Sequence, residues 1–137
     1  IIIRDALYYD IVIVEVATIE KLNILEATRE AMSQIALKTG VEVVLTDAMK
    51  LYLDKEVVDI VKGDQKSVSI AAASILAKVT RDRIMYQLDE IYPEFNFKNN
   101  KGYPTRQHFA ALDKYGVTEI HRKNYKPVIQ AMQNKLF

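Results

Sequence analysis

Apolar and polar positions in the first third of the chain follow two different spacings. The run at 11–16 (IVIVEV) is rich in β-branched residues, and a short run of this kind predicts a strand. From Thr18 to Ile35 the apolar residues recur every three or four positions, as on one face of a helix. Thr18 can cap the start of this helix, and Gly40 can end it. Residues 1–9 resemble the end of a further helix.

The rest of the chain continues with two strands and a longer helical pattern. Ser67 can cap that helix, and Pro93 would end it. Strands that alternate with helices indicate the α/β class, with a small sheet. The expected elements are strands at 41–46 and 57–61, a turn at 63–64, a helix from about 67 to 91, a loop at 94–104 and two or three short helices after it.

Composition narrows the class of protein. The chain has 137 residues, of which 50% are hydrophobic and 27% charged, as in an ordinary globular domain. It contains no cysteine, which excludes disulfides, thiolate metal sites and a cysteine nucleophile. No apolar run reaches the roughly 20 residues of a membrane span, and no secretory signal is evident, so we expect no membrane partner and a cytoplasmic location. Because the chain begins with Ile1 rather than Met, its length need not be the native one.

The net charge of +1 hides an uneven distribution. Residues 1–97 hold 11 basic and 16 acidic residues, whereas residues 98–137 hold 8 basic and 2 acidic ones. Tyrosines lie among these basic residues, a combination typical of nucleic-acid-binding surfaces. A solvated, lysine-rich surface is the simpler alternative, and charge alone leaves both open.

Two aspartates are candidates for chemistry. Asp47 follows an apolar strand, and the carboxyl ends of strands are where ligands bind in open α/β sheets. The alternative is that it caps a turn beginning at Ala48. Asp82 lies within the long helix, where it could instead form a surface ion pair with Lys78, four residues earlier. Together the two carboxylates would suit Mg²⁺ or Mn²⁺, although two-metal phosphodiester chemistry usually uses three or four.

Several longer motifs resemble one known family. The run from Lys62 to Arg83 (KGDQKS, then IAAASI and AKVTRDR) closely resembles the type 2 ribonuclease H family, ribonuclease HII. The resemblance extends to KGYPT at 101–105 with His108, to IHR at 120–122, and to NIL and TDAM at 23–25 and 46–49. These blocks stand in family order over residues 11–128.

The resemblance implies a ribonuclease H-like α/β fold, a mixed sheet flanked by helices with a helical C-terminal extension. Residues 1–97 would form part of the core and residues 98–137 the basic extension. It also implies an endoribonuclease that uses Mg²⁺ or Mn²⁺ to hydrolyse the RNA strand of RNA–DNA hybrids, and to nick duplex DNA 5′ of a single ribonucleotide during DNA repair.

The same resemblance assigns roles to individual residues. Asp47 and Asp82 match two of the family's acidic metal ligands, and Tyr103 matches the tyrosine beside the ribose, where the 2′-hydroxyl separates RNA from DNA. Four basic residues are plausible phosphate contacts by charge and position. These are Lys62, Lys66, Lys101 and Arg122.

The chain departs from the family pattern at its front. The family opens with a strand bearing an adjacent Asp-Glu pair, followed by a Gly-Arg-Gly loop that reads the ribonucleotide, and this chain has no such opening. We therefore expect the first strands to be absent and the chain alone to be inactive or nearly so. Two smaller departures are Pro104, where glycine is usual, and Asn100, where many members have histidine. Pro104 would stiffen the backbone beside Tyr103.

Two other functions stay open. The chain could be a non-catalytic nucleic-acid-binding domain that uses its basic region, or a part of a protein with no function of its own. Gln133–Phe137 (QNKLF) also resembles the peptide by which bacterial replication proteins bind the sliding clamp, although Leu136 and Phe137 could simply pack on the body.

Overall fold

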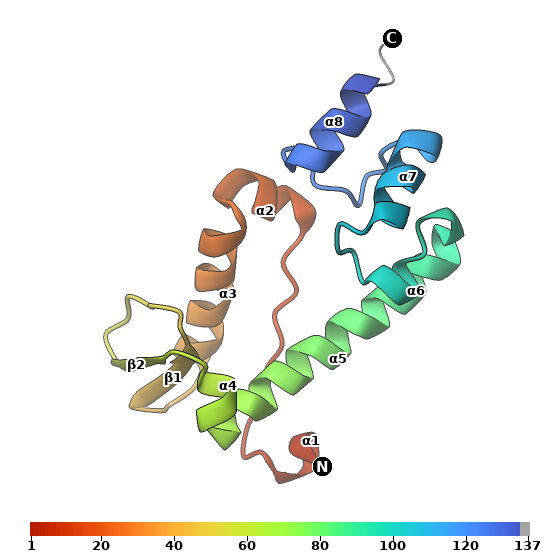
Figure 1. The fold of residues 1–137 in the computed structure, drawn as a ribbon. Helices are drawn as coiled ribbons and strands as arrows, with labels where there is room; N and C mark the ends of the chain where they lie inside the picture. The colour runs from red at the N-terminus through yellow and green to blue at the C-terminus, as the bar shows by residue number, and fades with distance from the viewer. Residues whose placement is uncertain (135–137) are drawn as a thin grey trace. The chain divides into compact units, whose positions relative to one another are not determined.

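The computed structural model describes residues 1–134. These residues divide into two compact units, one comprising Ile1–Lys78 and the other beginning at Val79. The long helix α5, Val68–Ile91, starts in the first unit and ends in the second (Figure 1). The sequence predicted this helix with nearly the same bounds, and Ser67 caps it as expected, since Ser67 Oγ accepts a hydrogen bond from the Ile70 N–H.

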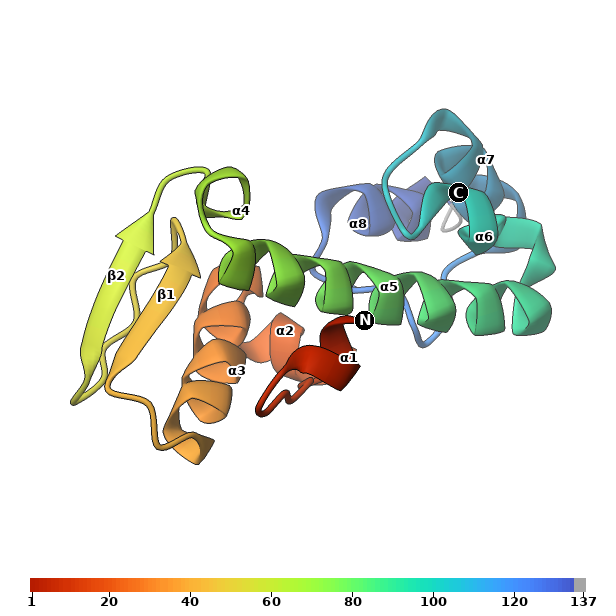
Figure 2. The same cartoon turned by 90° about the horizontal axis from the view of Figure 1, so that it is seen from below.

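The first unit pairs two strands with helices, which confirms the α/β class. Its two strands form a parallel pair, in which Val43 aligns with Glu56 and Asp47 with Ile60. Figure 2 shows the strands side by side with α3 beside them. The elements of the unit before α5 are α1 (Ile2–Asp5), α2 (Val16–Leu22), α3 (Ile24–Lys38), β1 (Val43–Asp47), β2 (Glu56–Ile60) and α4 (Gly63–Lys66).

The two faces of strand β1 differ in exposure. Thr46 is only 1% exposed, and its hydroxyl donates to the Met49 carbonyl at 2.7 Å. Val43 and Leu45 point to the other face and are 45% and 40% exposed. Asp47 shares that exposed face at the end of the strand.

Two predictions for the first 40 residues are wrong in detail. Residues 11–15 form no strand, and α2 begins at Val16, before the expected cap at Thr18. The single helix expected up to Gly40 is two helices, which meet at Asn23. The start of the chain forms only the four-residue α1.

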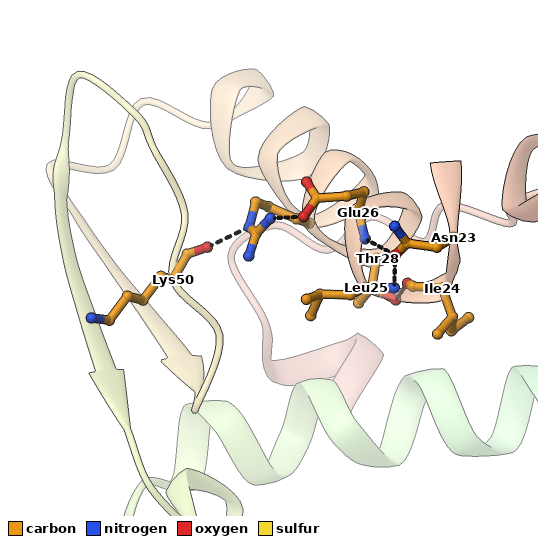
Figure 3. Close-up of polar contacts among 7 residues, drawn as sticks. Asn23, Ile24, Leu25, Glu26, Thr28 and Lys50 are labelled. Carbon is orange, nitrogen blue, oxygen red and sulfur yellow. Dashed lines mark hydrogen bonds and ion pairs between the residues drawn. The ribbon is translucent and has the colours of Figure 1, made fainter. Parts of the chain in front are cut away.

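Asn23 causes the break between α2 and α3. Its φ of 69° lies in the left-handed region, which ends α2. Its side-chain oxygen then accepts hydrogen bonds from the backbone N–H groups of Leu25 and Glu26, at 2.9 and 3.1 Å, and so caps α3 (Figure 3). One residue therefore both ends one helix and starts the next.

The second unit is helical around an aromatic core. The stretch expected to be a loop contains two short helical turns, and two short helices follow it, as predicted. These elements are η1 (Pro93–Phe95), α6 (Phe97–Asn100), α7 (Arg106–Tyr115) and α8 (Lys126–Asn134). Its buried core consists of Phe95, Phe97, Ala111, Leu112, Val128 and Ala131. Among residues 1–134, no helix is long and apolar enough to cross a membrane.

Candidate functional site

Asp47 lies at the carboxyl end of β1, where the sequence analysis expected a functional side chain. Its Oδ1 accepts a hydrogen bond from the backbone N–H of Gly63 at 2.9 Å. Gly63 is the first residue of α4, so this carboxylate ties the start of α4 to the end of β1. The side chain therefore does not cap the turn at Ala48, which was the alternative, and it stays exposed.

Gly63 is the residue that lets α4 approach the strand so closely. A Cβ at this position would lie 2.7 Å from Ile70 Cδ1 and 3.3 Å from both the Asp47 Cα and the Thr46 carbonyl oxygen. Any side chain would push α4 away from β1 and lengthen the contact with Asp47. The glycine of the KGD motif is thus required for packing at the end of β1.

Asp82, in the second unit, forms an ion pair with its neighbour Arg81, whereas the sequence favoured Lys78. Arg81 donates from Nε and Nη2 to Asp82 Oδ1, at 3.0 and 2.8 Å. The hydrogen bond with Asp82 is the main cause of a raised pKa for Arg81, whose burial acts in the opposite sense. Arg81 also donates from Nη1 to the Tyr103 hydroxyl at 3.1 Å, and its guanidinium lies 5.6 Å from the centre of the tyrosine ring.

The loop that carries Tyr103 is held by a buried asparagine. Asn100 is 7% exposed; its amide nitrogen donates to the Phe95 carbonyl at 2.7 Å, and its amide oxygen accepts from the Gly102 N–H at 2.8 Å. Lys101 and Gly102 both have positive φ, of 53° and 80°. The buried amide therefore stabilises a tight turn that presents Tyr103 at 59% exposure.

Two buried histidines also hold the loop that carries Tyr103, one directly and the other through the first. His108 Nδ1 lies 3.1 Å from the Tyr103 carbonyl oxygen, and His108 Nε2 lies 3.2 Å from His121 Nε2. His121 Nδ1 in turn lies 2.8 Å from the Thr118 hydroxyl and 3.2 Å from the Thr118 nitrogen. Both histidines contact Phe95 and Phe97. Burial, and then the charge of His108, lowers the pKa of His121 to about 4.

The four predicted phosphate contacts are divided between the units. Lys62 and Lys66 are exposed at the two ends of α4, in the unit that carries Asp47. Lys101 and Arg122 lie in the unit that carries Asp82 and Tyr103. Each of these two stacks on a tyrosine: Lys101 Nζ is 3.7 Å from the ring centre of Tyr86, and the Arg122 guanidinium is 4.7 Å from that of Tyr125.

The fit of a metal ion can be judged from the donors. Carboxylate oxygens are the ligands that Mg²⁺ and Mn²⁺ prefer, and Asp47 and Asp82 supply them. However, residues 1–134 contain no group of three or more histidine, aspartate or glutamate side chains that could hold a metal ion. Each carboxylate therefore suits the ion in donor type, but among the described residues neither unit supplies the three or four carboxylates that a two-metal centre usually uses. An adjacent Asp-Glu pair does occur, at 89–90, but it lies near the end of α5 and not on a strand.

Sequence reasoning missed three residues that organise this site. Arg81 stands within the AKVTRDR motif, but neighbours in a helix do not normally face each other, so its contact with Asp82 was not expected. In the sequence, Asn100 stands out only as a departure from the family pattern. His108 stands out only as part of a motif, and its burial could not be read from the sequence. The clamp-like peptide ends in residues 135–137, which lie outside the described residues, and it stays a prediction.

Comparison with known proteins shows which family the chain resembles in sequence. Residues 1–128 match the sequence profile of the family described as Ribonuclease HII. The chain is 52% identical over 128 residues to "Ribonuclease HII" of Clostridioides difficile, which covers 91% of this chain and 50% of that protein. It is 48% identical over 130 residues to the Bacillus subtilis protein of the same name, covering 93% and 51%. For the Francisella tularensis protein the identity is 49% over 130 residues, covering 93% and 70%.

The fold is of the α/β class, and the relatives named above all bear the name of a ribonuclease. The chain belongs to the ribonuclease HII family. The chain spans about half the length of the first of these relatives.

Proposed function

We propose that the protein containing this chain is an endoribonuclease of the ribonuclease H type. It hydrolyses the RNA strand of RNA–DNA hybrids and nicks duplex DNA on the 5′ side of single ribonucleotides. The observation that carries the proposal is the contact set of Arg81, which joins Asp82 to Tyr103. These two residues come from separate motifs, and the family resemblance gives one a role at the metal and the other a role at the sugar.

Each proposed site residue has a chemical role that its surroundings support. Asp47 and Asp82 are two of the carboxylates that would hold Mg²⁺ or Mn²⁺, which when bound would supply an activated water and charge stabilisation at the departing 3′ oxygen. Tyr103 is exposed on a loop that Asn100 and His108 hold through hydrogen bonds, so its ring can lie against a sugar without ordering the backbone first. The basic residues bind phosphates. They are Lys62 and Lys66 in the first unit and Lys101 and Arg122 in the second.

A binding measurement tests the role of Tyr103 separately from catalysis. Stacking of a base on an aromatic side chain contributes about 1–3 kcal/mol, and we take the lower part of this range for a sugar, so Tyr103→Ala weakens binding of a short RNA–DNA hybrid about tenfold. Fluorescence anisotropy with a labelled hybrid, in buffer without divalent ions, measures the affinity.

Tyr115→Ala is the matched control. Tyr115 is 52% exposed in the same unit and also has a lysine ammonium over its ring, that of Lys114 at 4.9 Å, but it lies outside the proposed site. Its substitution leaves the affinity within about twofold. Equal effects of the two substitutions would reject the role of Tyr103 and favour binding by general basic charge.

The second candidate function is a non-catalytic nucleic-acid-binding domain. The charge of residues 98–137, with 8 basic and 2 acidic residues, favours it. Under this alternative the chain binds nucleic acid, but Asp47 and Asp82 bind no divalent ions. Metal titration separates the two functions.

A further inference from the structure

The orientation of Tyr103 depends on one side chain of α5. The ring is 59% exposed, so packing alone leaves it free to turn about its side-chain bonds. Arg81 restrains it twice, through the hydrogen bond from Nη1 to the hydroxyl at 3.1 Å and through the guanidinium 5.6 Å from the ring centre. Both contacts depend on where the guanidinium lies.

The guanidinium itself is fixed by Asp82. Nε and Nη2 both donate to Oδ1 of Asp82, at 3.0 and 2.8 Å, so two of the three guanidinium nitrogens face the carboxylate. The third nitrogen, Nη1, is left to face Tyr103. Side-chain exposures of 37% for Arg81 and 26% for Asp82 mean that water screens this ion pair only in part.

We infer that Arg81 is a positioning residue, which holds the Tyr103 ring in one orientation for the sugar of a bound nucleic acid and is itself anchored by Asp82. This inference rests on the proposed function, because it takes Tyr103 as the residue that meets the sugar. It gives Asp82 a second role, independent of any metal: the carboxylate orients Arg81, and Arg81 orients the tyrosine.

The direction of the hydrogen bond adds a chemical detail. An arginine can only donate, so the Tyr103 oxygen accepts from Nη1 and its own proton stays available. Tyr103 therefore donates to the nucleic acid, and the matching group is an acceptor oxygen such as that of a ribose 2′-hydroxyl. A lysine at position 81 cannot replace the arginine, because one ammonium cannot match the flat fork that serves both partners.

A double-substitution cycle tests the inference on the 137-residue chain. Two short labelled duplexes serve as probes, one with a single internal ribonucleotide and one entirely of DNA, in buffer with EDTA. Arg81→Lys keeps the charge, and Tyr103→Phe removes only the hydroxyl. We expect each to lower the preference for the ribonucleotide duplex about fivefold, and the double variant to lower it no further, because both remove the same contact.

Two further variants separate positioning from a general effect. Asp82→Asn lowers the same preference about threefold although no metal is present, because the neutral amide holds Arg81 less firmly. Arg83→Lys is the matched control: Arg83 is exposed two residues further along α5, and the same substitution there leaves the preference unchanged. Circular dichroism shows whether each variant is folded. If Arg81→Lys does not fold, Tyr103→Phe still tests the contact, because it removes only the hydroxyl.

The outcomes distinguish this inference from the proposed function. If the unaltered chain prefers the ribonucleotide duplex but Arg81→Lys keeps that preference, Arg81 does not position Tyr103, and the proposed function stands. The inference fails in the same way if the effects of Arg81→Lys and Tyr103→Phe multiply in the double variant. If the unaltered chain shows no preference, both the inference and the proposed role of Tyr103 are wrong.

Discussion

The hydrogen bonds of His108 and His121, which hold the Tyr103 loop, depend on which ring nitrogen carries the proton. The Tyr103 carbonyl can only accept, so His108 carries its proton on Nδ1 and accepts at Nε2. His121 must then donate from Nε2 and accept at Nδ1, where the Thr118 N–H and hydroxyl both donate. Every ring nitrogen has a hydrogen-bond partner in this arrangement. A proton added at His121 Nδ1 would bring that N–H against the Thr118 N–H.

A pH dependence of stability follows from this pair. The pKa of His121 is about 4 in the folded chain, below the ordinary value of 6.5 in the unfolded one. Between these values the unfolded chain binds more protons, so the free energy of unfolding falls as the pH is lowered from 6.5 towards 4, by roughly 1–3 kcal/mol. Urea denaturation at pH 7 and pH 5 measures the loss.

His121→Gln is the comparison for this prediction. It removes the titrating ring, so the difference in unfolding free energy between pH 7 and pH 5 becomes smaller, even though the variant is less stable at both. If the variant kept the full pH dependence, other groups, such as carboxylates, would have to be its source.

At the residue scale, the sequence singled out candidate residues for chemistry but not the buried polar side chains that support them. Asp47 and Tyr103 are exposed, and Asp82 is partly exposed. The sequence did not reveal Asn100 and His108, because the burial of a polar side chain depends on packing between residues that are far apart in the chain. Whether the three surface residues act as the resemblance implies stays a prediction.

At the scale of elements, the spacing of apolar residues predicted the long helix α5 correctly. It wrongly predicted a strand where, among the described residues, no second strand is available to pair with it. Helix α5 has nearly the predicted bounds. Residues 11–15 have strand-forming residues, but in residues 1–134 no strand pairs with them, and propensity without a hydrogen-bonding partner does not make a strand. The break at Asn23 was hidden because the apolar spacing continues through it.

The junction of β1, α4 and α5 supports a prediction about Gly63. Gly63→Ala places a methyl group 3.3 Å from the Asp47 Cα and the Thr46 carbonyl, so α4 must move. We expect a loss of about 1–3 kcal/mol in unfolding free energy, the usual cost of overpacking. Thermal melting followed by circular dichroism measures it.

Gly40→Ala is the matched control, since a Cβ at Gly40 has no atom within 4 Å among the described residues. Its backbone tolerates a side chain, so the substitution changes the stability by less than about 0.5 kcal/mol or raises it slightly. Equal losses at Gly40 and Gly63 would mean that flexibility, and not the close contact with β1, explains the glycine of the KGD motif.

At the scale of the whole molecule, the acidic groups and the basic groups are unevenly shared. The carboxylates proposed for metal binding lie one in each unit. Among residues 1–134, neither belongs to a group of three or more histidine, aspartate or glutamate side chains that could hold a metal ion. The predicted boundary after residue 97 stays a prediction, while the structure divides the chain after Lys78. The sequence predicted the family from motifs over residues 11–128, and the family profile matches residues 1–128.

Activity is the prediction that belongs to this scale. Because two carboxylates are fewer than two-metal hydrolysis uses, we expect the 137-residue chain to nick a duplex with one ribonucleotide no faster than the uncatalysed background in Mn²⁺. Gel analysis of a labelled duplex measures nicking. Strong Mn²⁺-dependent nicking would contradict this expectation.

Metal titration by calorimetry then decides between the two candidate functions. A nuclease core binds Mn²⁺ weakly through Asp47, and Asp47→Asn abolishes the heat of binding. Asp64→Asn is the control, because Asp64 is an exposed acid of α4 outside the proposed site. A chain whose titration is the same with and without Asp47 would be the non-catalytic binding domain.

The parallel pairing of β1 with β2 has a consequence for the behaviour of the chain in concentrated solution. In residues 1–134 neither strand pairs with a third, so each has one edge of N–H and C=O groups without a strand partner, and β1 also exposes Val43 and Leu45. Such an edge is a template on which another extended segment can add as a new strand. The strand that ends at Asp47 is therefore also where copies of this chain would begin to aggregate, and Val43→Lys would protect it.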